Sequence, residues 1–275
     1  MPTVTRAASM PGGTSAPGRA EIGQRTLRTD PWWRAPIITF VLLVIWLAYG
    51  AVRVMSQRNY FVEQYHYLTP FYSPCVTASC TPESRDFGTW FGEFPPLLPY
   101  ATIGLVFLFG FRLSCYYYRR AYYRSFWVSP PACAVAEPHK GYSGETKFPL
   151  IVQNLHRYFF LLAVLLSLVN SYDAIRAFQG KNGGVGIGLG TVIMVINVVL
   201  LWSYTLGCHS CRHIIGGRLR SFSRHPMRYK GWTLVSWLNA RHMQFAWTTL
   251  GTLLITDLYI ALVASGTITD LRIVN

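Results

Sequence analysis

Five long apolar stretches constrain the fold of this chain more than any other feature. They are Pro36 to Val52, Phe94 to Phe111, Leu150 to Val169, Val185 to Leu206 and Phe245 to Ser265. An α-helix needs about 20 mainly apolar residues to cross the hydrocarbon core of a bilayer. The whole chain is 51% hydrophobic and only 13% charged, whereas soluble domains carry about 25% charged residues. The sequence therefore predicts an all-α integral membrane bundle of five transmembrane helices.

The placement of charge predicts how this bundle is oriented. The net charge is +14, and the basic residues gather in the N-terminal tail, after the second span and after the fourth span. The segment after the first span carries mainly acids instead, namely Glu63, Glu83, Asp86 and Glu93. Basic segments remain on the cytoplasmic side of a membrane. We therefore expect a cytoplasmic N-terminus and an external C-terminus, with a basic face that also suits lipid headgroups or an acidic partner.

The chain divides into a tail and one membrane domain. Residues 1-31 are rich in Ala, Gly, Pro, Ser and Thr and lack an apolar run, which predicts a disordered cytoplasmic tail. Residues 32-275 form the five-helix transmembrane domain. In its longest predicted external loop, Cys75 and Cys80 either form a small disulfide loop or remain thiols, and the sequence leaves both open.

Aromatic and basic residues alternate from Cys115 to Trp127, directly after the second span. Such a pattern can bind single-stranded nucleic acid by stacking. Beside a membrane helix it is better explained as an interfacial helix, with rings in the headgroup layer and arginines toward phosphate. We therefore expect membrane lipid, and not nucleic acid, as the partner of this segment.

Cysteines and histidines gather at the predicted cytoplasmic ends of four helices. The candidate metal ligands are Cys115, Cys133, Cys208, Cys211, His156, His209, His213 and His242. Helical bundles build metal and cofactor sites from facing side chains in this way. Ionisable side chains near membrane spans are rare and tend to be functional, so the sequence predicts a bound metal cofactor.

Three kinds of site fit these ligands. A structural zinc needs four Cys or His ligands, and Cys208 with Cys211 has a suitable C-x-x-C spacing. A b-type haem needs two facing histidines, and a Rieske-type [2Fe-2S] cluster needs two cysteines and two histidines. Spacing alone does not choose among them. A separate candidate is Asp257, a carboxylate inside the fifth span, since such groups are costly to bury.

Several motifs together resemble the five-helix membrane-anchor subunit of bacterial succinate dehydrogenases. The motifs are Arg112 to Arg120, Ser129 to Cys133, Asn154 to Tyr158, Gly207 to His213 and Asn239 to His242. The resemblance covers the chain from the first span to the end. It implies an anchor for a flavoprotein and an iron-sulfur subunit, through which electrons from succinate pass to a membrane quinone near the cytoplasmic helix ends, in a complex that can form a higher oligomer.

The type that this chain most resembles carries a Rieske-type [2Fe-2S] cluster in place of haem. The resemblance implies two cysteine and two histidine ligands among the eight candidates. A haem b anchor of the same complex is the alternative, and a non-redox transporter or scaffold using Asp257 is another. The chain lacks a flavin-binding fingerprint and the cysteine runs of soluble iron-sulfur proteins, so we expect it not to oxidise succinate alone.

Overall fold

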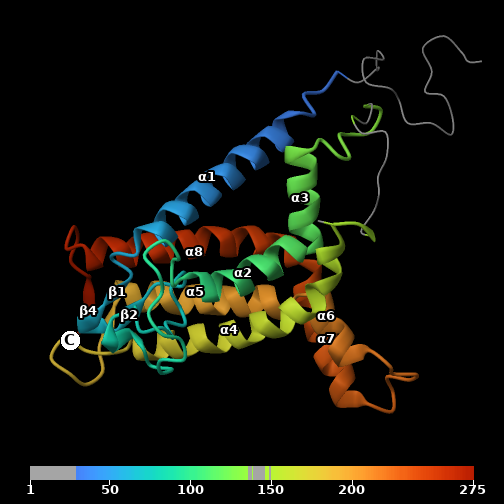
Figure 1. The fold of residues 1–275 in the computed structure, drawn as a ribbon. Coiled ribbons are helices and arrows are strands. Elements are labelled where there is room, and N and C mark those ends of the chain that lie inside the picture. The colour runs from blue at the N-terminus through green and yellow to red at the C-terminus, as the bar shows by residue number, and fades with distance from the viewer. Residues whose placement is uncertain (1–28, 136–137, 139–145, 149) are drawn as a thin grey trace, which may run out of the picture.

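A computed structural model describes residues 29–135, 138, 146–148 and 150–275, so most of the predicted tail lies outside the described residues. Four helices run side by side as a bundle: α2 (Thr102–Ser114), α4 (His156–Arg176), α5 (Leu189–Leu206) and α8 (His242–Ala264). A fifth helix, α1 (Arg34–Ser56), lies beside the bundle at one end and diverges from it toward the other (Figure 1). The fold is therefore mainly helical, as predicted.

Among the described residues, four helical segments are long and apolar enough to cross a membrane. They are Arg34–Ser56, Leu150–Arg176, Leu189–Leu206 and His242–Ala264. The predicted second span differs from its expected bounds, because its helix begins only at Thr102 and has 13 residues. Pro95, Pro96 and Pro99 precede it, and proline lacks the N–H that a helix interior requires.

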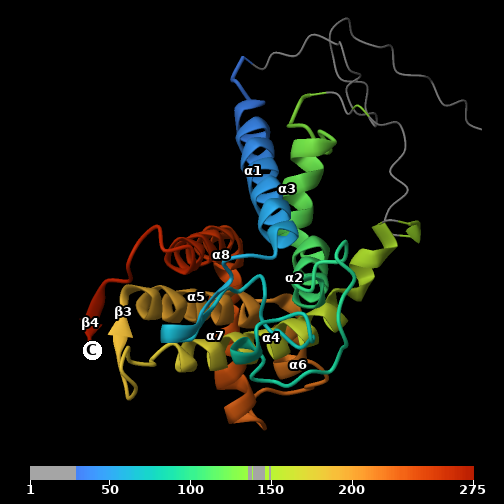
Figure 2. The same ribbon diagram turned by 60° about the vertical axis from the view of Figure 1, so that its left-hand side comes forward.

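Shorter helices cover one end of the bundle, which we call the basic end. They are α3 (Tyr116–Phe126), the 3-10 helix η4 (Leu150–Leu155), α6 (His209–Gly216) and α7 (Pro226–Ala240). Helices α3 and α7 lie across the direction of the bundle (Figure 1), and α3 packs along α1 (Figure 2). The helix predicted after the second span is thus present, and it changes direction sharply from α2.

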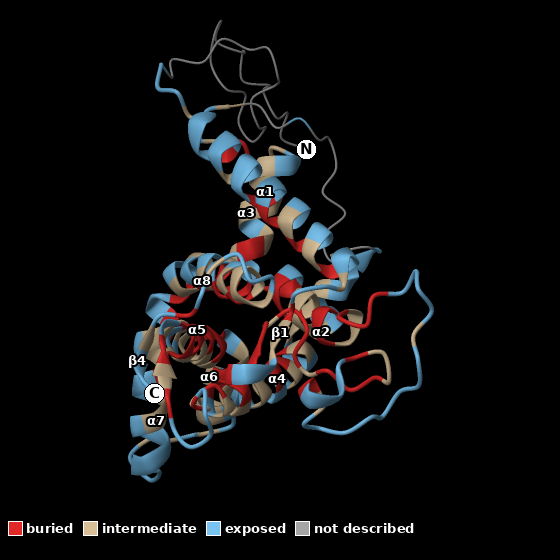
Figure 3. Ribbon diagram, turned by 90° about the vertical axis from the view of Figure 1, so that its left-hand side faces the viewer, coloured by how far each residue is buried: buried red, intermediate tan, exposed pale blue. Residues whose placement is uncertain are grey.

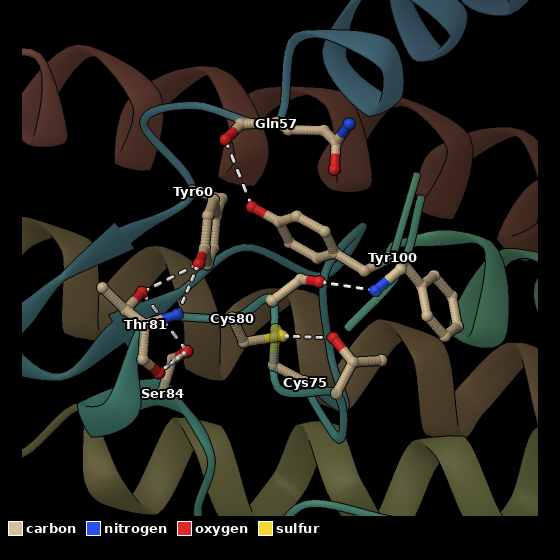
Figure 4. Close-up of a disulfide and its surroundings, with 10 residues drawn as sticks. Gln57, Tyr60, Cys75, Cys80, Thr81, Ser84 and Tyr100 are labelled. Atoms are coloured by element: carbon tan, nitrogen blue, oxygen red, sulfur yellow. Dashed lines mark hydrogen bonds between the residues drawn. A yellow bond between two sulfur atoms is a disulfide. The ribbon is translucent and has the colours of Figure 1, made fainter. Parts of the chain in front are cut away.

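The opposite end, which we call the disulfide end, consists of loops and short strands. Cys75 and Cys80 form a disulfide, with their Cα atoms 6.1 Å apart. Figure 4 shows Tyr60 next to it, where its hydroxyl accepts a hydrogen bond from the Thr81 backbone N–H at 2.9 Å. The remaining elements are β1 (Phe61–Val62), η1 (Glu63–Tyr65), β2 (Tyr67–Leu68) and η2 (Pro82–Ser84).

Two short antiparallel pairings were not predicted. Strand β1 pairs with β2, and β3 (Ile187–Gly188) pairs with β4 (Arg272–Val274). The Asp270 carboxylate accepts a hydrogen bond from the backbone N–H of Gly190 in α5 at 3.0 Å. It also accepts hydrogen bonds from the hydroxyls of Tyr67 at 2.9 Å and Tyr259 at 2.7 Å. The C-terminal segment is thereby fixed to the start of α5.

Burial follows the pattern of a membrane protein. The interior between α2, α4, α5 and α8 is buried, while most of α1 is exposed (Figure 3). The exposed side chains of α1 are large and apolar, for example Ile38 at 60% and Val52 at 68%. An apolar helix of this kind is stable only in lipid or against a partner.

A buried ion pair joins α1 to α8. Asp257 is fully buried, and its carboxylate accepts hydrogen bonds from Arg53 Nε and from the Tyr49 hydroxyl, both at 2.6 Å. Closer to the basic end, Trp46 Nε1 donates to the backbone carbonyl of Leu250 at 3.3 Å. The intramembrane acid that the sequence singled out therefore has two partners within the described chain, as a structural acid would.

Replacing Asp257 tests the importance of this pair. The Asp257→Asn variant leaves the Arg53 guanidinium without its counter-charge, and breaking a buried pair costs about 3–5 kcal/mol. We expect a loss of about 3 kcal/mol, the lower end of that range, because the Arg53 side chain is 12% exposed. Thermal unfolding in detergent measures the loss. The exposed Glu83→Gln control should unfold as the wild type does, and equal stability of both variants would contradict the prediction.

Candidate functional site

Two cysteines occupy equivalent positions where a bundle helix breaks. Cys115 lies between α2 and α3 with φ −67° and ψ 132°, and Cys208 lies between α5 and α6 with φ −69° and ψ 146°. Both residues are in extended backbone, and each precedes the first residue of the following helix. The break also separates the two cysteines of the C-x-x-C spacing, because Cys208 is in the turn and Cys211 is within α6.

Two histidines begin the other two bundle helices at the same end. His156 is the first residue of α4, and His242 is the first residue of α8. Each meets one of the cysteines: Nε2 of His156 lies 3.0 Å from Sγ of Cys208, and Nε2 of His242 lies 3.6 Å from Sγ of Cys115. Four predicted ligands, two thiols and two imidazoles, thus come together from four helix ends.

Aromatic rings and a hydroxyl hold the two imidazoles in place. Phe111 stacks on His156 at a centroid distance of 5.0 Å, and Tyr204 stacks on His242 at 4.7 Å. Ser114 Oγ lies 2.8 Å from Nδ1 of His156. The sequence analysis did not identify any of these three supporting residues. Only Ser114 could have been suspected, because it is next to the candidate ligand Cys115 in the chain.

A small hollow of about 130 Å³ lies between the pairs. Its lining includes the four Cys and His side chains of the pairs together with Ser114, Gln153 and His209. Among the described residues, Nδ1 of the buried His242 has no hydrogen-bond partner, and a buried nitrogen of this kind is costly without one. The described chain contains no group of three such side chains close enough for a single metal ion. The arrangement consists of two Cys–His pairs.

Burial favours the protonated form of both thiols. It raises the pKa of Cys208 to about 12, and it also raises the pKa of Cys115. A thiol binds metal only after losing its proton. Metal binding here would therefore release protons and would weaken as the pH falls.

The other predicted ligands are placed differently. Cys211 is buried in the apolar core of the basic end, and His209 is exposed at the edge of the hollow. His213 is exposed on α6, and Cys133 is exposed in the turn after α3. Neither of these two residues lines the hollow in the described structure. The structure thus brings together four of the eight candidates.

A much larger apolar cavity of about 930 Å³ adjoins the hollow. It lies between α1, α2, α3, the segment around η4 and α8, and its walls include Trp46, Phe109 and Tyr118. The exposed side chains of Trp127 and Phe148 are part of its lining, so the cavity opens to the surroundings. Ser114 and Gln153 line both spaces. A ligand in the large cavity would therefore lie next to the Cys–His pairs.

The close packing around His242 depends on a glycine. A Cβ atom at Gly207 would lie 2.9 Å from the carbonyl oxygen of Ser203 and 3.2 Å from Nδ1 of His242. We expect the Gly207→Ala variant to lose about 1–3 kcal/mol of stability by overpacking. A Cβ at Gly251 meets nothing within 4 Å, so the Gly251→Ala control should lose none. Thermal unfolding of both variants is the measurement, and an unaffected Gly207→Ala would refute this account of the site.

Comparison with known proteins places this geometry in a family. The model of a family described as actinobacterial succinate dehydrogenase subunit SdhC matches residues 34–266. Among solved structures, a chain of the Mycobacterium smegmatis Sdh1 complex in the apo form is similar, with 61% sequence identity and a TM-score of 0.88. The match covers 96% of this chain and 100% of that chain. No curated protein matches this chain.

The family model spans all the helices that could cross a membrane and all four residues of the Cys–His pairs. Several apolar helices and membership of this family indicate a multi-pass protein of the bacterial cytoplasmic membrane. The chain belongs to the family of actinobacterial SdhC subunits and is the membrane-anchor subunit of a succinate dehydrogenase.

Proposed function

We propose that this anchor receives electrons from a soluble iron-sulfur subunit and passes them to a membrane quinone at its basic end. The main support for this proposal is that one hollow is lined by Cys115, Cys208, His156 and His242. This donor set fits a Rieske-type [2Fe-2S] cluster, in which two cysteines bind one iron and two histidines bind the other. The sulfurs and imidazoles would exchange their present contacts with each other for bonds to iron.

The chemistry that such a cluster supplies, when bound, is one-electron transfer at a potential that histidine ligation raises above that of all-cysteine clusters. The residues of the chain hold the ligands in place. Ser114 fixes His156, while stacking on Phe111 and Tyr204 sets the planes of the two imidazoles. Burial of both thiols in the apolar core excludes water from the site.

The orientation inferred from charge supports this assignment. We infer that the basic end is cytoplasmic and the disulfide end is external, where oxidising conditions favour a disulfide. With α2 as a fifth crossing, the N-terminus is cytoplasmic and the C-terminus is external. Helices α3 and α7 then lie at the cytoplasmic interface. Exposed cations of this end, such as Arg220, Arg224 and Arg228, offer complementary charge to a soluble partner, and we propose the flavoprotein and iron-sulfur subunits as the partners.

The large apolar cavity is the proposed quinone site. Its volume of about 930 Å³ lies within the roughly 300–1,000 Å³ typical of small-molecule sites. Its walls are apolar and aromatic, and the shared residues Ser114 and Gln153 bring it beside the ligand set. A quinone would place its head against the wall formed by Ser114 and Gln153. Its isoprenoid tail would extend through the apolar part of the cavity toward lipid.

A haem b anchor remains the alternative function. It would use His156 and His242 as axial ligands, but both rings already stack on aromatic side chains, and the hollow between them measures about 130 Å³. Haem also gives no role to Cys115 and Cys208. A transporter or scaffold using Asp257 is less well supported because that acid pairs with Arg53.

Serine substitutions test the cluster. In the purified complex, Cys115→Ser and Cys208→Ser should each lose iron and the electron paramagnetic resonance signal of a Rieske-type centre, because serine does not replace a thiolate ligand of iron. Cys133→Ser and Cys211→Ser, which alter cysteines outside the two Cys–His pairs, are matched controls and should keep both. A haem absorption band with unchanged iron-sulfur content in all four variants would replace the cluster by haem.

Filling the large cavity tests the quinone site. Leu47→Trp adds a bulky ring to its wall, and overpacking of about 1–3 kcal/mol corresponds to a rise of about 5- to 150-fold in the KM for quinone. Val44→Trp, one turn away on α1 and outside this lining, is the control. Succinate oxidation with a soluble electron acceptor should be unchanged in both. An unaltered KM in Leu47→Trp would exclude this cavity as the quinone site.

A further inference from the structure

One arginine lies inside the bundle beside the Cys–His pairs. The charge pattern grouped Arg112 with the basic segment after the second span, yet the structure places it in α2 with only 4% of its surface exposed. None of the ion pairs found among the described residues includes it. A guanidinium stays protonated in proteins. The interior of the basic end therefore contains a positive charge that has no ion-pair partner among the described residues.

Neutral groups hold this charge in place. The guanidinium donates hydrogen bonds to the hydroxyls of Tyr118 and Thr249, the latter at 3.2 Å. It also lies over the rings of Tyr118 and Tyr204, at 5.4 and 5.1 Å from their centroids. Its Nε has no partner among the described residues. Charges at this depth are costly to bury and are usually functional.

The position of the charge relates it directly to the ligand set. The Tyr204 ring has the guanidinium against it and the His242 imidazole stacked on it at 4.7 Å, with 10° between the ring planes. Arg112 is also three residues before Cys115, whose Sγ lies 3.6 Å from Nε2 of His242. Both members of the Cys115–His242 pair, a sulfur and an imidazole, thus lie near this charge.

We propose that Arg112 is an electrostatic positioning residue that holds the reduction potential of the bound cluster high. This inference rests on the proposed function. Such a cluster, when bound, would gain one negative charge on accepting an electron from the soluble iron-sulfur subunit, and would lose it again on passing that electron to the quinone. A fixed positive charge in a medium of low dielectric constant stabilises the reduced form. Net charge around a cluster is one of the factors that set its potential.

Two independent variants test this charge, one by removing it and one by neutralising it. Arg112→Met deletes it, and Thr249→Asp places a carboxylate where a hydroxyl now accepts a hydrogen bond from the guanidinium. Arg112→Lys keeps the charge, and Thr249→Asn has nearly the shape of Thr249→Asp without its charge. The measurement is a redox titration of the cluster in the purified complex, followed by low-temperature electron paramagnetic resonance.

We expect the midpoint potential to shift to more negative values in Arg112→Met and Thr249→Asp and to remain near the wild-type value in Arg112→Lys and Thr249→Asn. If Arg112→Met fails to assemble the cluster, Thr249→Asp, which keeps the guanidinium and all four ligands, decides the question. An unchanged potential in Thr249→Asp with an intact signal would overturn this inference alone. Absence of any Rieske-type signal from the wild-type complex would overturn the proposed function and this inference with it.

Discussion

The candidate site depends on two breaks in the backbone at the same end of the bundle. An extended cysteine follows α2 directly and follows α5 after Gly207, and a new helix starts in another direction after each cysteine. A break near a membrane leaves carbonyl and amide groups that need partners, and the structure provides some: Asn239 donates to the carbonyl of Gly207 at 2.7 Å. Side chains of neighbouring helices therefore stabilise the breaks. These breaks turn Cys115 and Cys208 toward residues that begin α4 and α8.

The basic end combines features that are costly in an apolar interior. Two buried thiols, two imidazoles and one buried arginine lie in or beside a core that otherwise consists of aliphatic and aromatic side chains. Aromatic stacking and hydroxyl groups satisfy most of these polar groups without adding a carboxylate. At the disulfide end the opposite holds, because Asp257 and Asp270 each pair with an arginine. The two ends thus accommodate buried charge differently, since Arg112 at the basic end has no ion-pair partner among the described residues.

Much of the architecture could be predicted from hydrophobicity and charge. Four apolar stretches became helices close to their expected bounds, because a run of about 20 apolar residues has few other stable structures. The second stretch did not, since hydropathy gives no weight to the helix-breaking effect of Pro95, Pro96 and Pro99. The strand pairing of the C-terminal segment was also missed, because β3 and β4 are too short to show an alternating pattern.

The sequence by itself determined that this chain is a helical membrane protein and which end of it is basic. It also determined which eight side chains were candidate ligands. These properties follow from the type of each residue and its position along the chain, without any knowledge of how the helices pack. Only the tertiary structure decided that Cys115, Cys208, His156 and His242 meet. Their pairing joins residues 52 and 127 positions apart in the chain, and the direction of each side chain depends on where a helix breaks. The burial of Arg112 was likewise decided by packing. A cation at the end of an apolar stretch gives the same sequence pattern whether its side chain faces water or the core.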